Sequence, residues 1–499
     1  MLPHLRICRP AVMGAPGATA AAGHDLPEQP DVLVVGGGTA ALCAAIAARR
    51  GGAGVLLLEQ APRWLRGGNT RHSRNLRIRH EVPTPLSPGC YDRDEFCADL
   101  QRATGGSADA ALARLLVEHS ARSTDWLAAA GVQFQPVASG VLPRSRKTAF
   151  LLGGGTAMLN RLYAAAEALG VDIRYSCGVT DLKLERGRLA WVDCASASAS
   201  TSTSTSTRAS ERTRLRPRAV VVCCGGAQAN RAWLRSRWGD AADGFINRGT
   251  PHATGEVLHC LLRDGVRAAG DPDGAYLVAV DARSPADDGG IVTRVRCMPA
   301  GIVVDGTGRR IHDEGGDTAS TRYALWGRRL ADCPGQIAHV ILDGQGLRGA
   351  PPSLYPPLLA DDVDALAAAL SIPRAALEKT LAEYNAAVRP PAAGDEDVAG
   401  WHTEGLTPPK SRHALPLTEP PFGAYPMRPG ITFTYHGVAV DADTRVRLED
   451  GGVVENLFAA GMIMAPNLMP RGYLSGLAMS IGVVFGRLAG EEAARHVVG

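Results

Sequence analysis

The sequence predicts an α/β protein in which a parallel-sheet domain is built from two separate segments and interrupted by an inserted α+β lobe. Three observations carry this prediction. Short apolar strands alternate with helical stretches in the first part of the chain. Mixed elements rich in proline and glycine follow from about residue 236. Near residue 410 the pattern of apolar strands and helices returns. At 499 residues the chain is long enough for two or three domains.

The first elements form a βαβ unit. An apolar strand in residues 31–38 runs into glycines, residues 39–50 are alanine-rich with helical spacing, and a second strand at 55–58 ends at Glu59. The same reasoning predicts further elements along the first segment. They are two helices between residues 92 and 130, a helix at 156–169, a strand at 171–175, a hairpin at 179–192 and a strand at 219–224.

These elements suggest a division of the chain into four parts. Residues 1–30 are predicted to be a disordered extension, 31–235 the first part of the sheet domain, 236–409 a capping lobe that includes a helical stretch at 361–388, and 410–499 the second part. The last part contains a strand at 457–460 and a glycine-punctuated helix at 474–496. Alternating serine and threonine at 195–212 predicts a disordered insert, because such a segment buries little apolar area.

The amino-acid composition argues against several classes of protein function. The net charge is only +3, so nucleic acid is not expected as a partner. Of the 53 basic residues only four are lysine, so a lone arginine is weak evidence of function. Eleven cysteines without a CxxC pair indicate reduced thiols, and no apolar run is long enough to span a membrane; together these predict a cytoplasmic protein.

A glycine motif predicts a bound dinucleotide. Gly36-x-Gly38-x-x-Ala41 follows a strand and opens a helix, and Glu59 ends the next strand 21 positions after Gly38. The glycines let a pyrophosphate approach the helix N-terminus, while Glu59 can accept hydrogen bonds from ribose hydroxyls. Three later runs, at 66–70, 224–226 and 459–461, are typical of a chain that wraps one extended FAD. The predicted fold is therefore a Rossmann-like FAD-binding domain in two sequence segments with an inserted capping domain.

The chain resembles the flavoprotein family of succinate dehydrogenases, fumarate reductases and 3-ketosteroid dehydrogenases. Its closing segment, 471–476 through 486–494, is similar to the flavin-binding C-terminus of that family. Within the family, four runs resemble those of the FAD-dependent tricarballylate dehydrogenases: 40–45, 66–77, 322–327 and 431–435. The resemblance implies non-covalently bound FAD. The cofactor-binding residues that we expect are Gly36, Gly38, Thr39, Ala40, Glu59, Gly68, Asn69, Thr70, Gly225, Gly461, Ser475 and Leu477.

The resemblance also implies a reaction. It is the oxidation of tricarballylate, a small polycarboxylate, to cis-aconitate, with electrons passing to a membrane-associated iron-sulfur partner. Such a reaction needs a base, a hydride acceptor and cations that hold carboxylates, and arginine is well suited to that last task. No metal site is expected in this chain.

Three arginines carry catalytic expectations from the resemblance. Arg322 matches the proton-transfer arginine, Arg471 a substrate carboxylate clamp, and Arg296 a relay residue, although the glutamate that normally precedes the relay residue is Thr293 here. The substrate-binding histidine of the reductases, expected near residues 432–434, is also absent. Both departures argue against fumarate as the substrate.

Several alternatives stay open. A steroid dehydrogenase or a reductase of an unsaturated acid would share the fold, and a non-catalytic flavin-binding redox protein would bind FAD without rapid reduction by a small acid. His436 is either a substrate contact or structural. A group of arginines in the loop after the second strand either includes a flavin or substrate contact or is solvated: Arg71, Arg74, Arg77 and Arg79.

Overall fold

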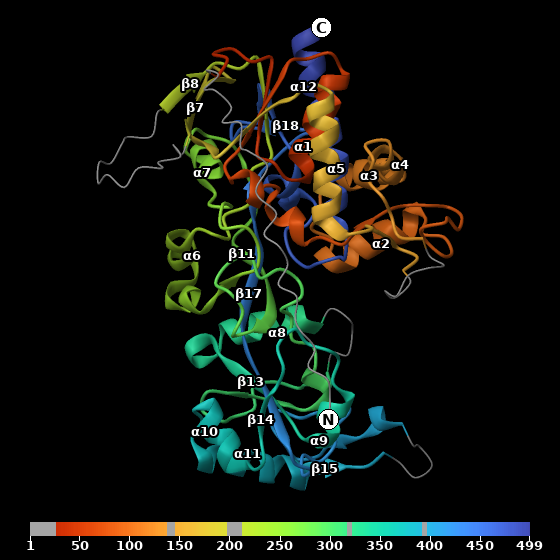
Figure 1. The fold of residues 1–499 in the computed structure, drawn as a ribbon, viewed down its shortest axis with the longest axis vertical. Helices are drawn as coiled ribbons and strands as arrows, with labels where there is room; N and C mark the ends of the chain where they lie inside the picture. Colours follow the sequence, from red (N-terminus) through yellow and green to blue (C-terminus); the bar gives the residue numbers. More distant parts are fainter. Residues whose placement is uncertain (1–25, 137–144, 197–211, 317–321, 392–396) are drawn as a thin grey trace, which may run out of the picture.

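The computed structural model describes residues 26–136, 145–196, 212–316, 322–391 and 397–499. The predicted N-terminal extension up to residue 25 and the centre of the serine/threonine insert, 197–211, lie outside these residues. Figure 1 shows two parts along the long axis, one with α1, α5 and α12 and the other with α8 to α11. This arrangement confirms the predicted fold class, an α/β domain formed by two chain segments with an inserted α+β lobe.

The first part is organised by a six-stranded sheet with the order β18-β19-β9-β1-β2-β5. All neighbouring pairs are parallel except β18 with β19. The central strands are buried along their whole length, as expected of a parallel sheet covered on both faces. The strands are β1 (Val32–Val35), β2 (Val55–Glu59), β5 (Asp172–Tyr175), β9 (Ala219–Val222), β18 (Arg445–Arg447) and β19 (Val453–Ala459).

Helices α1 (Thr39–Arg50), α5 (Gly154–Ala168) and α12 (Leu477–Val498) gather at this sheet (Figure 1). The glycines of α12 allow it to approach α1 closely: a Cβ at Gly486 would lie 2.5 Å from the carbonyl oxygen of Ala40, and one at Gly490 would lie 2.2 Å from that of Ala44. The glycine-punctuated helix of the sequence is thus the close packing partner of the first helix, although α1 ends at Arg50 and α12 begins only at Leu477.

Smaller elements complete the first part. Between residues 92 and 130 the structure has three helices rather than the two predicted, because the chain turns at residues 121 and 122 and then begins another short helix. The helices are α2 (Arg93–Thr104), α3 (Ala110–Ser120) and α4 (Ser123–Ala128). The strands are β3 (Asn75–Arg77) with β4 (Thr148–Phe150), and β6 (Cys177–Glu185) with β7 (Arg188–Ser196) and β8 (Arg212–Leu215).

The inserted lobe contains a second sheet with the order β10-β17-β13-β12, in which β17 also pairs with β11 and β14. Its strands are β10 (Ile246–Asn247), β11 (Ala268–Asp281), β12 (Ile302–Asp305), β13 (Ala338–Leu342), β14 (Leu358–Ala360) and β17 (Phe422–Val438), and a separate pair is β15 (Val388–Arg389) with β16 (His402–Thr403). Strand β17 runs through the middle of the molecule in Figure 1. It belongs to this sheet although it follows residue 410.

The helices of the inserted segment are α6 (Arg231–Trp238), α7 (Glu256–Arg263), α8 (Arg322–Ala331), α9 (Gly344–Gly349), α10 (Val363–Leu370) and α11 (Arg374–Ala387). The predicted helical stretch 361–388 is two helices. The chain breaks between them because Ser371 has a φ of 56° and Pro373 precedes α11. Among the described residues, no helix is both long and apolar enough to cross a membrane.

Candidate active site

One cleft collects segments from both parts of the molecule. From the first part come the β1–α1 turn, the ends of β2 and β9, the loop 67–75 and the start of α12; from the inserted lobe come residues 248–257, Tyr276, 290–294 and 432–433. The carboxyl ends of parallel strands meet at one edge of a sheet, which is the usual place for a ligand in such folds. The cleft is therefore the candidate active site.

The β1–α1 turn is shaped for a close approach to a ligand. Gly36 has a φ of 111°, and a Cβ there would lie 2.6 Å from the carbonyl oxygen of Cys223, so the position requires glycine. Gly38 is the N-cap of α1 and contributes no side-chain cap, and α1 has no acidic residue in its first turn. The positive end of the α1 dipole thus opens on the cleft, which fits the diphosphate of a dinucleotide.

Glu59 lies at the end of β2 and lines the cleft, but its carboxylate also ties two loops together. One oxygen accepts a hydrogen bond from the Gly67 amide at 3.0 Å and the other from the Ala61 amide at 2.9 Å. Burial raises the pKa of Glu59, and these backbone hydrogen bonds offset part of that increase. Glu59 therefore faces the cleft, where it can accept a hydrogen bond from a ribose, and at the same time holds the start of the loop at Gly67.

The loop after Gly67 connects the first part of the molecule to the inserted lobe. Asn69 donates from Nδ2 to the carbonyl oxygen of Thr432 at 2.7 Å, and its Oδ1 accepts from the Thr250 amide at 3.0 Å. The Asp288 carboxylate lies 2.9 Å from Arg71 Nη1 and 2.6 Å from His72 Nε2. A ligand in the cleft therefore sits beside contacts that set the position of the lobe.

Eleven of the twelve expected cofactor-binding residues line the cleft. The twelfth, Leu477, is not part of the lining and instead lies in the hydrophobic core with no exposed surface. The structure thus brings together segments that span more than 400 residues of sequence.

The three arginines that were expected to be catalytic are placed differently. Arg471 is exposed and lies outside the cleft lining, where its Nε donates to the carbonyl oxygen of Thr104 at 2.7 Å. Arg296 is also exposed and outside the lining. Arg322 is the first residue of α8, but its side chain lies outside the described part of the structure. Two of the three expected side chains, those of Arg471 and Arg296, therefore lie outside the cleft lining.

Other arginines line the cleft, and the sequence did not single out two of them. Arg248 is buried and donates from Nη1 to Thr432 Oγ1 at 2.5 Å and from Nε to the carbonyl oxygen of Gly290 at 3.2 Å. Arg294 and Arg74 also line the cleft. No local motif marks Arg248, which follows a two-residue strand, so only the fold could distinguish it from the other arginines.

Three stacked aromatic rings form another part of the lining that the sequence did not predict. The ring of Tyr276 lies 4.5 Å from that of Tyr473 and 5.1 Å from that of Phe433, measured between centroids, and both pairs are nearly parallel. His436, by contrast, lies outside the lining and stacks on Trp233. Burial lowers the pKa of His436, and the nearby charge of Arg237 lowers it further.

Comparisons with known proteins agree with this geometry. A family model described as FAD binding domain matches residues 31–470. A fumarate reductase (cytochrome) of Shewanella frigidimarina is 27% identical over 496 residues, covering 96% of this chain and 79% of that protein. The family match and the glycine-lined cleft together identify FAD as the cofactor.

Two solved structures share the fold. The open conformation of a flavocytochrome c3 fumarate reductase has a TM-score of 0.72 at 23% identity, covering 95% of this chain and 79% of that chain. A 3-ketosteroid delta1-dehydrogenase from Sterolibacterium denitrificans has a TM-score of 0.71 at 18% identity, covering 94% and 100%. These proteins are named for fumarate and ketosteroid chemistry, so the comparisons support the family and not the finer resemblance to tricarballylate dehydrogenases.

Proposed function

The chain belongs to the FAD binding domain family of succinate dehydrogenase and fumarate reductase flavoproteins, and from this premise we propose that it oxidises tricarballylate to cis-aconitate. It is an FAD-dependent oxidoreductase. The observation that carries the finer proposal is the set of arginines from both parts of the molecule that line the cleft: Arg74, Arg248 and Arg294. A substrate with three carboxylates needs such a set, since each guanidinium can hold one carboxylate.

The proposed reaction removes a proton from one carbon and a hydride from its neighbour, and a carbon–carbon double bond forms. FAD, when bound, supplies the hydride acceptor. The chain contributes the residues that hold the cofactor: Gly38 and the N-terminus of α1 for the diphosphate, Glu59 for a ribose, and the loop 67–75 together with Ser475 for the remainder.

The remaining roles are proposals for the arginines. Arg322 takes the proton, Arg471 holds a substrate carboxylate after leaving the Thr104 carbonyl, and Arg296 relays the proton outward. We also propose the domain boundaries given above, with β17 extending from the second part into the sheet of the lobe. We further propose a cytoplasmic location, and an iron-sulfur electron-transfer protein at a membrane as the partner that reoxidises the cofactor. A cytochrome appears in the name of the Shewanella relative, so transfer to another redox protein has a precedent in the family.

Anaerobic absorption spectra test the proposed substrate. Adding tricarballylate to the purified yellow protein should bleach the oxidised flavin bands within the mixing time of a stopped-flow experiment, and succinate should bleach them more slowly. Unchanged bands with every small acid, while dithionite still reduces the flavin, would exclude this substrate class and would favour a non-catalytic redox protein.

A second candidate substrate class is a 3-ketosteroid or another ring-bearing ketone. The stack of Tyr276, Tyr473 and Phe433 favours it, because flat apolar rings pack well against aromatic faces. The same spectra with 4-androstene-3,17-dione separate the two candidates. Bleaching by the steroid and not by tricarballylate would replace the first proposal with the second.

A further inference from the structure

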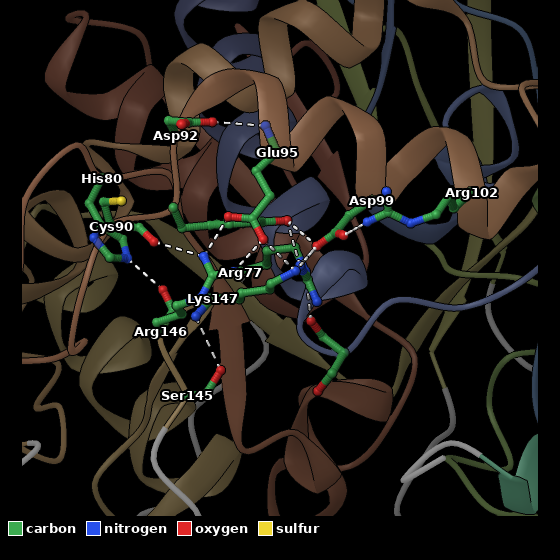
Figure 2. A network of polar contacts seen from close by, with 12 residues as sticks. Arg77, His80, Cys90, Asp92, Glu95, Asp99, Arg102, Ser145, Arg146 and Lys147 are labelled. Atoms are coloured by element: carbon green, nitrogen blue, oxygen red, sulfur yellow. Dashed lines mark hydrogen bonds and ion pairs between the residues drawn. The ribbon is translucent and has the colours of Figure 1, made fainter. Parts of the chain in front are cut away.

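A buried carboxylate, Asp99 on α2, is the centre of a cluster of charges beside the cleft (Figure 2). It accepts hydrogen bonds from Arg77 Nη1 at 3.0 Å, Lys147 Nζ at 2.7 Å and the Tyr91 hydroxyl at 2.9 Å, and it also pairs with Arg102. Burial alone would raise the pKa of Asp99, but the hydrogen bonds from Lys147 and Tyr91 and the charge of Arg77 lower it overall. Asp99 is therefore ionised at neutral pH.

Arg77 connects this cluster to the cleft. Its side chain is almost fully buried, and its Nε donates to the carbonyl oxygen of Ser475 at 3.1 Å. Its backbone amide donates to Ser480 Oγ at 2.9 Å, inside the first turn of α12. Since Ser475 and Gly476 both line the cleft, a single guanidinium lies between Asp99 and the cleft wall.

The other end of the same loop also rests on α2. We call residues 471–476 the cleft loop. Arg471 donates to the carbonyl oxygen of Thr104 at the end of α2, and a Cβ at Gly472 would lie 1.8 Å from the carbonyl oxygen of Ala103. The cleft loop, which carries Tyr473 and ends at the N-cap of α12, is therefore attached to α2 at both ends.

We propose that α2 acts as a brace for the cleft loop and that Asp99 is a positioning residue for FAD. Through Arg77, Asp99 fixes the Ser475 carbonyl and the first turn of α12 against the bound cofactor. It also compensates the buried positive charge of Arg77, so that this charge does not act on the cofactor unopposed. The inference rests on the FAD site described above and not on the identity of the substrate.

Asp99→Asn and Arg102→Gln form a matched pair of variants. Asp99→Asn removes the ion pairs with Arg77, Lys147 and Arg102, whereas Arg102→Gln removes only the last of them. Arg102 is largely exposed and has no hydrogen bond to the cleft loop in the described structure. For each variant, the FAD dissociation constant of the apoprotein is measured by flavin fluorescence, the midpoint potential of bound FAD by dye equilibration, and the melting temperature of the apoprotein by circular dichroism. None of these measurements uses a substrate.

In Asp99→Asn the FAD dissociation constant should rise at least tenfold. The midpoint potential should become more positive, because uncompensated positive charge favours the reduced cofactor; a tenfold change in relative affinity corresponds to about 30 mV for two electrons. Arg102→Gln should stay within twofold of the wild type for affinity and should leave the potential unchanged. A merely structural role of Asp99 would lower the melting temperature but would not move the potential.

Equal shifts of the potential in both variants, or no shift in Asp99→Asn, would overturn the proposal. If Asp99→Asn does not fold, Arg77→Lys serves in its place, since lysine keeps the charge near Asp99 but loses the Nε–H that binds Ser475. It should weaken FAD binding at least tenfold with the potential close to that of the wild type. Unchanged affinity in Arg77→Lys would show that the contact to Ser475 does not position the cofactor.

Discussion

The carboxylate of Glu59 occupies the space that a side chain at Gly37 would need. A Cβ at position 37 would lie 2.2 Å from Glu59 Oε2 and 2.3 Å from the Tyr163 hydroxyl, which donates to the Gly37 carbonyl oxygen at 2.8 Å. At Gly38, by contrast, the nearest atom to a Cβ would be Thr70 Oγ1 at 3.5 Å. The two adjacent glycines thus have different roles. Gly37 makes room for the side chains of Glu59 and Tyr163, whereas Gly38 leaves space for a ligand in the cleft.

Alanine substitutions at these two positions should therefore have different effects on the stability of the apoprotein. Gly37→Ala should lower the melting temperature of the apoprotein and weaken FAD binding, because it displaces Glu59 or Tyr163. Gly38→Ala should leave the apoprotein as stable as the wild type but weaken FAD binding, since the methyl group enters the space next to the diphosphate. Calorimetry of the apoproteins and FAD titration check both. Tight FAD binding by Gly38→Ala would mean that the diphosphate does not lie at this turn.

We expect FAD to be held non-covalently. His72 is the histidine of the loop 67–75 that a covalent link to the flavin would need, but its Nε2 lies 2.6 Å from the Asp288 carboxylate, so the ring is engaged with the inserted lobe. Acid precipitation of the yellow protein should leave the flavin in the supernatant. Colour that stays in the pellet of the wild type and leaves the pellet of His72→Ala would contradict this expectation and identify His72 as the attachment point.

Arg471→Lys distinguishes a substrate clamp from a structural contact. Lysine keeps the charge but loses the two-pronged guanidinium, so a clamp should lose about 1 to 3 kcal/mol in kcat/KM, mainly through KM. In the structure this side chain instead binds the Thr104 carbonyl at the end of α2. Steady-state kinetics with tricarballylate and melting curves are measured together. A lower melting temperature with an unchanged KM would assign Arg471 to the brace alone.

Lys410 should give the stability of the protein a specific pH dependence. Burial lowers its pKa to about 8 from 10.5, while its Nζ donates to the carbonyl oxygens of Pro299 and Gly301. Between these two pH values the unfolded chain binds more protons, so the stability contributed by this group increases with pH. Below pH 8 the burial of the charged amine is a constant cost.

The test compares Lys410→Met with Lys379→Met, a substitution at an exposed lysine of α11. From pH 8 to 10.5 the free energy of unfolding of the wild type should rise relative to Lys410→Met by up to about 3 kcal/mol. Relative to Lys379→Met it should stay nearly constant. Parallel curves for all three proteins would show that Lys410 keeps an ordinary pKa in the folded state.

Sequence patterns predicted those helices and strands that are determined by residues close to one another in the sequence. The strand before Gly36, the helix after Gly38 and Glu59 at the end of β2 are fixed by residues close in sequence, so apolar periodicity and turn chemistry were sufficient. The cleft arginine Arg248 has no such signature, since its position results from the pairing of β10 with β17. Similarly, nothing near Asp99 in the sequence indicates that Arg77 and Lys147 converge on it.

The lack of a local sequence signature also limited the prediction of the domain boundaries and of the catalytic arginines. The predicted boundary placed residues 410–499 in the second part of the sheet domain, but the partners of β17 are strands of the inserted lobe, and only long-range pairing reveals this. The resemblance assigned Arg471 to the substrate, whereas the contact of its side chain depends on where α2 ends. Contacts between segments that lie hundreds of residues apart can be identified only from the three-dimensional structure.

The packing of α12 on α1 gives the last prediction, in which two glycines of one helix should respond in opposite ways. Alanine favours a helix interior over glycine by about 1 kcal/mol, so both Gly482→Ala and Gly486→Ala gain that amount from propensity. At Gly486 the new methyl group would lie 2.5 Å from the Ala40 carbonyl oxygen, which is backbone and cannot move without shifting α1. The resulting overpacking costs about 1 to 3 kcal/mol and outweighs the gain.

At Gly482 no atom lies closer than 3.5 Å to the added Cβ, so the melting temperature of the apoprotein should stay constant or rise. Gly486→Ala should melt at a lower temperature and should also bind FAD more weakly, because the new methyl group would displace α1, whose N-terminus lies at the cleft. Melting curves of the two apoproteins test the predicted difference in stability, and FAD titrations test the predicted loss of affinity. A Gly486→Ala protein as stable as the wild type would mean that α1 and α12 can separate without cost, and the glycine spacing of α12 would then need another explanation.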